Sequence, residues 1–351
     1  MLKRWVLLLG LVATATATLY LVGAPAPFLI GALVGGLLVA AFATAPDIPE
    51  VAGTFGQVMI GASVGTLVTV DLLGDLARHG WVIGLALVGT LATSLAWGQV
   101  LRYQPGVSAV TASFASIAGG ASGVVATARD VGADEPVVAT IQYLRVLVVL
   151  FTMPVVAKLF DPAASASGGG PSVVSTTWGA YLFTAIAVVL GFAVLRFVHF
   201  PGAAVLVPML LTAVLVATGW FADPAVPDPL LNAGYLAIGA QVGLKFTPAT
   251  LRIILRLLPL ALVQVTGTIL TCAGIGYLMA RLTDIGQLDA YLATTPGGLY
   301  AVVAVAISTG ADTGLVFTLQ VLRLFGSLLL VPVLARLLRP RPGEDPDTRP
   351  A

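Results

Sequence analysis

Long stretches of this chain carry apolar residues without any charged side chain. A membrane helix needs about 20 mostly apolar residues at about 1.5 Å of rise per residue. Stretches of that length cover residues 5–46, 51–70, 81–101, 103–128, 162–195, 200–222 and 257–280. Polar and turn residues divide the chain further, and the pattern predicts helices at 5–22, 27–42, 51–70, 80–100, 107–128, 136–159, 178–198, 202–220, 231–246, 254–280, 288–308 and 313–338. The expected fold is all-α and polytopic, with about 10–12 membrane segments.

The second half of the chain repeats the first half at a fixed offset of 178 residues. The segment Gly56–Gly65 matches Gly234–Gly243, and residues 56–159 align with 234–337 without a gap. Other identities join Gly119 and Gly120 with Gly297 and Gly298, Gly132 and Asp134 with Gly310 and Asp312, Gln142 and Arg145 with Gln320 and Arg323, and Pro154 with Pro332. Shared hydrophobicity alone would not align glutamine, arginine and aspartate. The sequence therefore predicts an internal duplication of a membrane module.

The duplication sets the expected domain boundaries. We expect a first membrane repeat at 1–160, a flexible linker at 161–177, a second repeat at 178–338 and a disordered charged tail at 339–351. The third helix of each half is short and glycine-rich, so it either spans the membrane or is broken or re-entrant. Six crossings per half would make the repeats parallel, and five would make them inverted. Basic residues near both ends predict cytoplasmic termini, and we favour inverted repeats.

Composition supports the membrane interpretation and excludes several function classes. Hydrophobic residues make up 58% of the chain and charged residues only 9%, against about 25% charged in soluble domains. The net charge of +1 does not predict a direct nucleic-acid partner. One cysteine and two histidines predict neither a disulfide nor a metal or cofactor site. We expect the lipid bilayer as a partner and leave a homo-oligomer open.

Arg145 and Arg323 are the most informative side chains. Arg145 lies near the middle of Val137–Ala157, a stretch that is otherwise uncharged, and Arg323 has the equivalent position in the second half. An unpaired arginine at that depth costs about 2.5–3.5 kcal/mol, so each guanidinium must face the protein interior or a water-filled cavity. Gln142 and Gln320 lie three residues earlier on the same helix face. The pairs predict either an anion or solute site, or structural hydrogen bonds to Asp134, Asp312 or helix-end carbonyls.

Two further features have both a structural and a functional interpretation. Asp134 and Asp312 precede the arginine helices, where a carboxylate either caps the helix or couples transport to protons or cations. The glycine pairs interrupt apolar segments at equivalent positions, next to Ser116, Ser122, Thr294, Thr295 and Pro296. Broken helices expose backbone groups to a substrate in transporters, although small residues also permit close helix packing. Close packing is the expected role of Gly31, Gly35, Gly36, Gly61 and Gly65.

This duplicated set of motifs resembles the AbrB-duplication membrane family over about residues 5–338. The resemblance rests on two Gly-x-x-x-Ile-Gly-x-x-x-Gly segments, two paired-glycine breaks and two Gln-x-x-Arg helices followed by a proline, in the same order. The first copy departs from the second by having Ile117-Ala118 in place of Thr295-Pro296. The family name implies regulation of gene expression, and some members carry the label ammonia monooxygenase. The residues here support neither direct DNA binding nor a copper site.

Three functions remain open from the sequence. The first is a secondary transporter or permease-like carrier of a small polar or anionic solute in the bacterial cytoplasmic membrane. Its expected binding residues are Arg145, Arg323, Gln142, Gln320, Gly119, Gly120, Thr295, Pro296, Gly297 and Gly298, with Asp134 and Asp312 for coupling. The second is a membrane-embedded sensor that acts indirectly on gene expression. The third, an enzyme, is disfavoured because no nucleophile–base pair, metal cluster or cofactor motif is recognisable.

Overall fold

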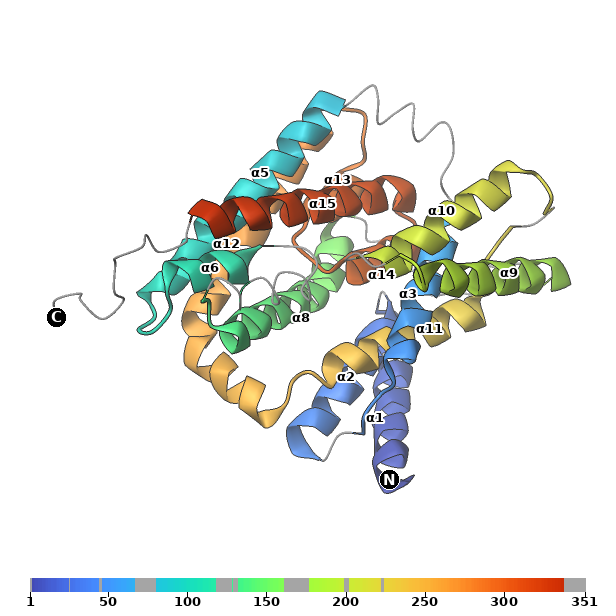
Figure 1. The fold of residues 1–351 in the computed structure, drawn as a ribbon, viewed down its shortest axis with the longest axis horizontal. Coiled ribbons are helices and arrows are strands. Elements are labelled where there is room, and N and C mark those ends of the chain that lie inside the picture. The colour runs from blue at the N-terminus through green and yellow to red at the C-terminus, as the bar shows by residue number, and fades with distance from the viewer. Residues whose placement is uncertain are drawn as a thin grey trace.

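The structure is a computed structural model that describes residues 2–24, 26–43, 46–66, 80–117, 128, 132–160, 177–198, 202–221 and 224–337. These residues form α-helices and one 3-10 helix and contain no β-strand (Figure 1). The expected all-α fold class is therefore confirmed. Nearly all of the expected linker at 161–177 and the whole of the tail at 339–351 lie outside the described residues.

The helices follow the predicted order in both halves. In the first half they are α1 (Leu2–Leu21), α2 (Pro27–Phe42), α3 (Glu50–Gly65), α5 (Gly80–Gly98), the 3-10 helix η1 (Gln99–Tyr103), α6 (Ala109–Ser116) and α8 (Glu135–Phe160). In the second half they are α9 (Trp178–Leu195), α10 (Ala203–Ala217), α11 (Asp228–Gly243), α12 (Pro248–Leu282), α13 (Gln287–Thr294), α14 (Leu299–Thr309) and α15 (Thr313–Leu337).

The described helices have the lengths and the outer surfaces of membrane helices. Five are long and apolar enough to cross a bilayer, namely Lys3–Leu21, Gly80–Tyr103, Glu135–Met153, Trp178–Leu195 and Pro248–Leu282. Large apolar side chains such as Leu85 and Leu270 point outward, with exposed fractions of 63% and 67%. A water-facing surface rarely carries so many apolar groups, whereas lipid favours them. The chain is a helical membrane protein. Its number of crossings and the orientation of its halves remain predictions.

Glycines bring matching helices of the two halves into close contact. A β-carbon at Gly61 of α3 would overlap the carbonyl oxygen of Val205 in α10, and one at Gly239 of α11 would overlap that of Leu29 in α2. Equivalent glycines thus contact equivalent helices, as a duplicated module requires. Gly31, Gly35, Gly36 and Gly65 also lie where a β-carbon would meet a neighbouring helix backbone. The expected small-residue packing is confirmed.

The helix contacts divide the described chain into two bundles. We call α1, α2, α3, α9, α10 and α11 the glycine-packed bundle, and α5, η1, α6, α8, α12, α13, α14 and α15 the broken-helix bundle. Figure 1 shows the two groups side by side. Helix contacts between them include α2 with α12 and α3 with α15. Both arginine helices, α8 and α15, belong to the broken-helix bundle.

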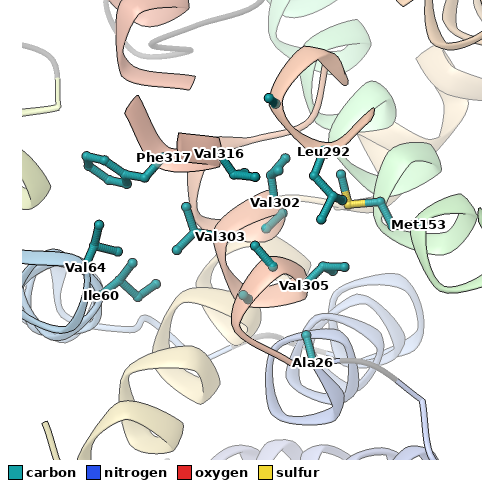
Figure 2. Close-up of a cluster of buried hydrophobic side chains, with 14 of the residues drawn as sticks. Ala26, Ile60, Val64, Met153, Leu292, Val302, Val303, Val305, Val316 and Phe317 are labelled. Atoms are coloured by element: carbon teal, nitrogen blue, oxygen red, sulfur yellow. The ribbon is translucent and has the colours of Figure 1, made fainter. Parts of the chain in front are cut away.

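Helix α14 of the broken-helix bundle lies where the two bundles meet. Its Val302, Val303 and Val305 are fully buried. Figure 2 shows them at the centre of a cluster that reaches α3 on one side and α8 and α13 on the other. Between membrane helices such valines stabilise the contact through close van der Waals packing. The apolar sequence of α14 therefore forms the core that joins the two bundles.

Candidate functional site

The apolar segment predicted at 288–308 is two helices separated by a break. Helix α13 ends at Thr294, and α14 begins at Leu299. Thr295 is extended, with φ −63° and ψ 138°, because a residue before proline is pushed out of the helical region. Gly298 is extended as well, with φ −74° and ψ 141°. The interruption expected at Thr295-Pro296-Gly297-Gly298 is present, and it leaves helix-end backbone groups to be satisfied by other elements.

Gln320 and Arg323 of α15 satisfy those backbone groups. The Gln320 amide nitrogen donates to the carbonyl oxygens of Leu292 at 2.9 Å, Ala293 at 3.3 Å and Thr295 at 3.2 Å. The Arg323 guanidinium donates to the carbonyl of Thr295, to that of Gly297 at 3.0 Å and to Oε1 of Gln320 at 2.6 Å. A cation at the C-terminal end of a helix interacts favourably with the helix dipole. The pair therefore holds the end of α13.

The first half builds the same arrangement around α6. The Gln142 amide of α8 donates to the carbonyl of Phe114 at 3.3 Å, and Arg145 donates to that of Ser116 at 3.1 Å. Phe114 and Ser116 match Leu292 and Thr294 at the repeat offset. The glycine pair Gly119-Gly120 and Ser122 lie outside the described residues. Of the structural alternatives expected for the arginines, the bond to helix-end carbonyls is the one present.

Both arginines are buried, as their position in the sequence required. Arg145 and Arg323 each expose only 4% of their surface, and Gln142 and Gln320 each expose 2%. Arg323 donates to the Gly297 carbonyl, and Gly297 and Gly298 lie against Val149 and Val146 of the Arg145 helix, so the two sites are neighbours. Among the described residues, the hydrogen-bond partners of the two guanidinium groups are backbone carbonyls and the Gln320 amide oxygen. Burial of two positive charges without an anion is costly.

Helix α8 brings the first site against the second break. A β-carbon at Gly297 would lie 3.0 Å from Cγ1 of Val149 and 3.3 Å from Cε of Met153. One at Gly298 would lie 3.5 Å from Cγ2 of Val146, the residue after Arg145. Since valine side chains occupy this space, glycine is needed at 297 for the break to approach α8. The end of α6, the break between α13 and α14 and the two arginine helices thus form one central region.

Asp134 and Asp312 cap the arginine helices. Oδ1 of Asp134 accepts a hydrogen bond from the backbone N–H of Val137 at 3.1 Å, and Oδ1 of Asp312 accepts one from Leu315 at 3.0 Å. This is the bonding expected of a helix N-cap. The capping interpretation is therefore confirmed. The structure brings neither carboxylate into hydrogen bonding with an arginine among the described residues, and a coupling role remains a prediction.

Helix α12 contributes residues to this region that the sequence did not single out. Thr294 Oγ1 at the end of α13 donates to the carbonyl of Cys272 at 3.0 Å. Cys272 is fully buried. A lone cysteine in an apolar run gives no sign of its neighbours, so this contact could not be predicted from the sequence. Among the described residues, no group of three or more histidine, cysteine or carboxylate side chains could hold a metal ion.

Comparison with known proteins agrees with the duplicated motifs. Residues 3–339 match the family model described as "Transition state regulatory protein AbrB". The chain is similar to "Putative regulator AbrB" of Escherichia coli (strain K12), with 34% identity over 90% of each chain. It is also similar to "Uncharacterized protein YhjN" of Bacillus subtilis (strain 168), with 25% identity over 84% of this chain and 80% of that protein.

Proposed function

This chain belongs to the AbrB family of membrane proteins, and we propose that it is a permease-like secondary carrier of a small polar or anionic solute. The observation that carries the proposal is the pair of neighbouring buried guanidinium groups, whose described hydrogen-bond partners are carbonyl and amide oxygens rather than carboxylates. An anion entering this region would neutralise charge that the described residues leave uncompensated.

The surrounding architecture supports a carrier more than a static bundle. The arginines of α8 and α15 bind the ends of α6 and α13. These polar groups lie in the centre of an apolar protein, which is where carriers bind their substrates. The proposed binding residues are Arg145, Arg323, Gln142 and Gln320 with the breaks at 119–120 and 295–298, and Asp134 and Asp312 are proposed for coupling. The proposed location is the bacterial cytoplasmic membrane, with both termini in the cytoplasm and the chain free to form a homo-oligomer.

A membrane-embedded sensor is the second candidate function. One observation favours it, since the names of the matched family model and of the Escherichia coli relative refer to regulation. A sensor would bind the solute in the same region and transmit a conformational change without moving the solute across the membrane. Any effect on gene expression would be indirect, because the net charge of +1 and the apolar surface do not suit DNA binding.

Flux through purified protein separates the two candidates. The full chain is reconstituted into liposomes, and uptake of radiolabelled acetate, propanoate, lactate and succinate is measured against protein-free liposomes. We expect saturable uptake of at least one anion. Arg323→Gln and Arg145→Gln should abolish uptake, because each removes a positive charge from the region. Arg281→Gln is the matched control, since this exposed guanidinium contacts Tyr277 on its own helix.

The variants also hold helix ends, so their folding is checked by monodisperse elution and thermal unfolding. Arg323→Lys keeps the charge but loses the forked bonds to two carbonyls. It should retain part of the uptake if the charge matters for the solute. Unchanged uptake in the Arg145→Gln, Arg323→Gln double variant would remove the proposed site. Binding of an anion without any flux would favour the sensor.

A further inference from the structure

Gln264 of α12 is a buried amide without a hydrogen-bond partner among the described residues. Its side chain is fully buried. Neither its amide nitrogen nor its amide oxygen has a hydrogen-bond partner among the described residues. An amide offers two donors and an acceptor oxygen, and burying these atoms unpaired costs free energy. Native proteins satisfy nearly all such groups, so an unpaired buried amide calls for a partner that the described residues do not supply.

The position of Gln264 on α12 places it beside the central region. Ala261, one turn earlier, packs in the cluster that contains Ala112, Ala115 and Ile117 at the end of α6. Cys272 is buried two turns later, and its carbonyl accepts the hydrogen bond from Thr294 at the end of α13. Gln264 therefore lies on the part of α12 that runs between the ends of the two broken helices.

The contacts of α12 with α5 support this placement. A β-carbon at Gly267 of α12 would meet the ring of Trp97 in α5. A β-carbon at Gly98, which follows Trp97 in α5, would meet the side chain of Ser116. Ser116 supplies the carbonyl that Arg145 binds. Gln264 lies one turn of α12 before Gly267, on the stretch of the helix that packs near α5 and Ser116.

The repeat gives a control for a purely structural role. Gln142 and Gln320 are equivalent and make equivalent bonds to helix ends. The residue equivalent to Gln264 is Ala86 of α5, which is also buried. The duplicated fold therefore does not require an amide at this position. An unpaired polar group that one half has and the other lacks fits a solute better than it fits the scaffold.

We propose that Gln264 hydrogen-bonds the solute and selects small carboxylates that carry a hydroxyl group. This inference rests on the proposed carrier function and names its substrate class. The unpaired Nε atoms of Arg145 and Arg323 and the Gln264 amide N–H are donors that suit carboxylate oxygens. The Gln264 amide oxygen is an acceptor, and it requires a donor on the solute. A site built to bond a substrate hydroxyl rejects the analogue that lacks it.

Lactate and propanoate test the inference because they differ only by one hydroxyl group. Both are measured as probes with the full chain in liposomes, and thermal stabilisation by each is measured in detergent. We expect the wild-type protein to prefer lactate. Gln264→Met replaces the amide with a side chain of similar volume. Lactate uptake by this variant should fall about tenfold, which corresponds to the loss of one hydrogen bond at the strong end of the usual range. Propanoate uptake should change little. The variant should be at least as thermally stable as the wild type, because no intramolecular bond is lost.

Gln99→Met is the matched control. The Gln99 amide already donates to the Leu95 carbonyl at 3.3 Å and to Ser113 Oγ at 3.2 Å. Its removal should lower thermal stability and leave the preference for lactate unchanged.

Equal loss of lactate and propanoate uptake in Gln264→Met, or uptake by the wild type without a preference for lactate, overturns the inference and leaves the carrier proposal intact. No uptake of any of the four anions contradicts the carrier proposal. The thermal measurement then tests the inference on its own. If lactate raises the unfolding midpoint of the wild type no more than that of Gln264→Met, the inference is overturned.

Discussion

At the scale of single residues, the glycines of α3 and α11 decide how closely the helices approach. Gly239→Ala should destabilise the protein, because its β-carbon would overlap the backbone carbonyl of Leu29. Backbone cannot move aside as a side chain can, so the cost should reach the range of about 1–3 kcal/mol typical of overpacking. The midpoint of thermal unfolding in detergent measures it.

Gly274→Ala is the control for this prediction. Gly274 lies inside α12, two turns before its end at Leu282, and a β-carbon there would meet nothing within 4 Å. Alanine in an open helix position is favoured over glycine by about 0.5–1 kcal/mol, so the variant should be equally stable or slightly more stable. Gly61→Ala should behave like Gly239→Ala, since the repeat places it against the Val205 carbonyl. Equal midpoints for Gly239→Ala and Gly274→Ala would contradict the proposed close contact.

The single arginines show what the sequence can and cannot predict at this scale. Their burial follows from charge and position alone, because a guanidinium in the middle of an apolar membrane helix must face the protein interior or a water-filled cavity. Their partners do not follow, since the Ser116 and Thr294 carbonyls lie 29 residues earlier in the chain. Only the tertiary path of α6 and α13 brings them near. Gln264 gave a weaker signal, namely one amide in an apolar run, and the absence of a partner emerges only from the packed structure.

At the scale of helices, the two aspartates allow capping and coupling to be separated. Asp312→Asn keeps the acceptor oxygen that bonds the Leu315 N–H but removes the charge, whereas Asp312→Ala removes both. Loss of a cap costs about 1 kcal/mol. We therefore expect Asp312→Ala to lower the unfolding midpoint and Asp312→Asn to change it little.

The same two variants test coupling once a transported anion is identified. If Asp312 only caps α15, Asp312→Asn should retain uptake that responds to an imposed proton or cation gradient. If the carboxylate carries the coupling ion, uptake by Asp312→Asn should continue down the solute gradient and lose its response to the ion gradient. Asp134→Asn is measured in parallel, because it caps α8 in the equivalent way.

Helix existence was easier to predict than helix ends. The pattern placed α2 and α15 almost as the structure has them, since turn residues bound each mostly apolar stretch. It began α12 at 254, whereas the helix begins at Pro248 with the Thr247 side chain accepting from the Thr250 N–H. The sequence Thr247-Pro248 is typical of a helix start. The hydrophobic pattern missed it because the start of α12 contains the polar residues Thr250 and Arg252. The predicted segment at 288–308 likewise needed its glycine pair to be divided into α13 and α14.

At the scale of the whole molecule, the duplicated halves do not form the two bundles. Each bundle takes helices from both halves, so that α3 packs on α10 and α11 on α2, while α5 packs on α12. The sequence repeat predicted matching helices but could not predict this exchange, because pairing between halves depends on surfaces far apart in the chain. The arginine sites belong to the broken-helix bundle, and the close contacts of Gly61 and Gly239 belong to the other bundle. In the proposed carrier, the broken-helix bundle would bind the solute and the glycine-packed bundle would support it.

This division predicts that linking the bundles stops transport. Val64 of α3 and Phe317 of α15 belong to one buried cluster that spans both bundles (Figure 2). In a Cys272→Ser background, cysteines at 64 and 317 are joined by a bifunctional thiol reagent. If transport requires the bundles to move relative to one another, linking should abolish anion uptake, and a cleavable linker should restore it after reduction.

A linked pair inside one bundle distinguishes restricted motion from chemical damage. Tyr20 of α1 and Phe28 of α2 lie in the glycine-packed bundle, with ring centroids 6.3 Å apart. Cysteines at these two positions, linked to the same extent as judged by gel mobility, should leave uptake near that of the unlinked protein. Because both pairs receive the same reagent, a difference between them reports on geometry alone. Full uptake with the 64–317 link complete would mean that the solute passes without relative motion of the bundles. The conformational change would then have to lie within the broken helices, close to Arg145 and Arg323.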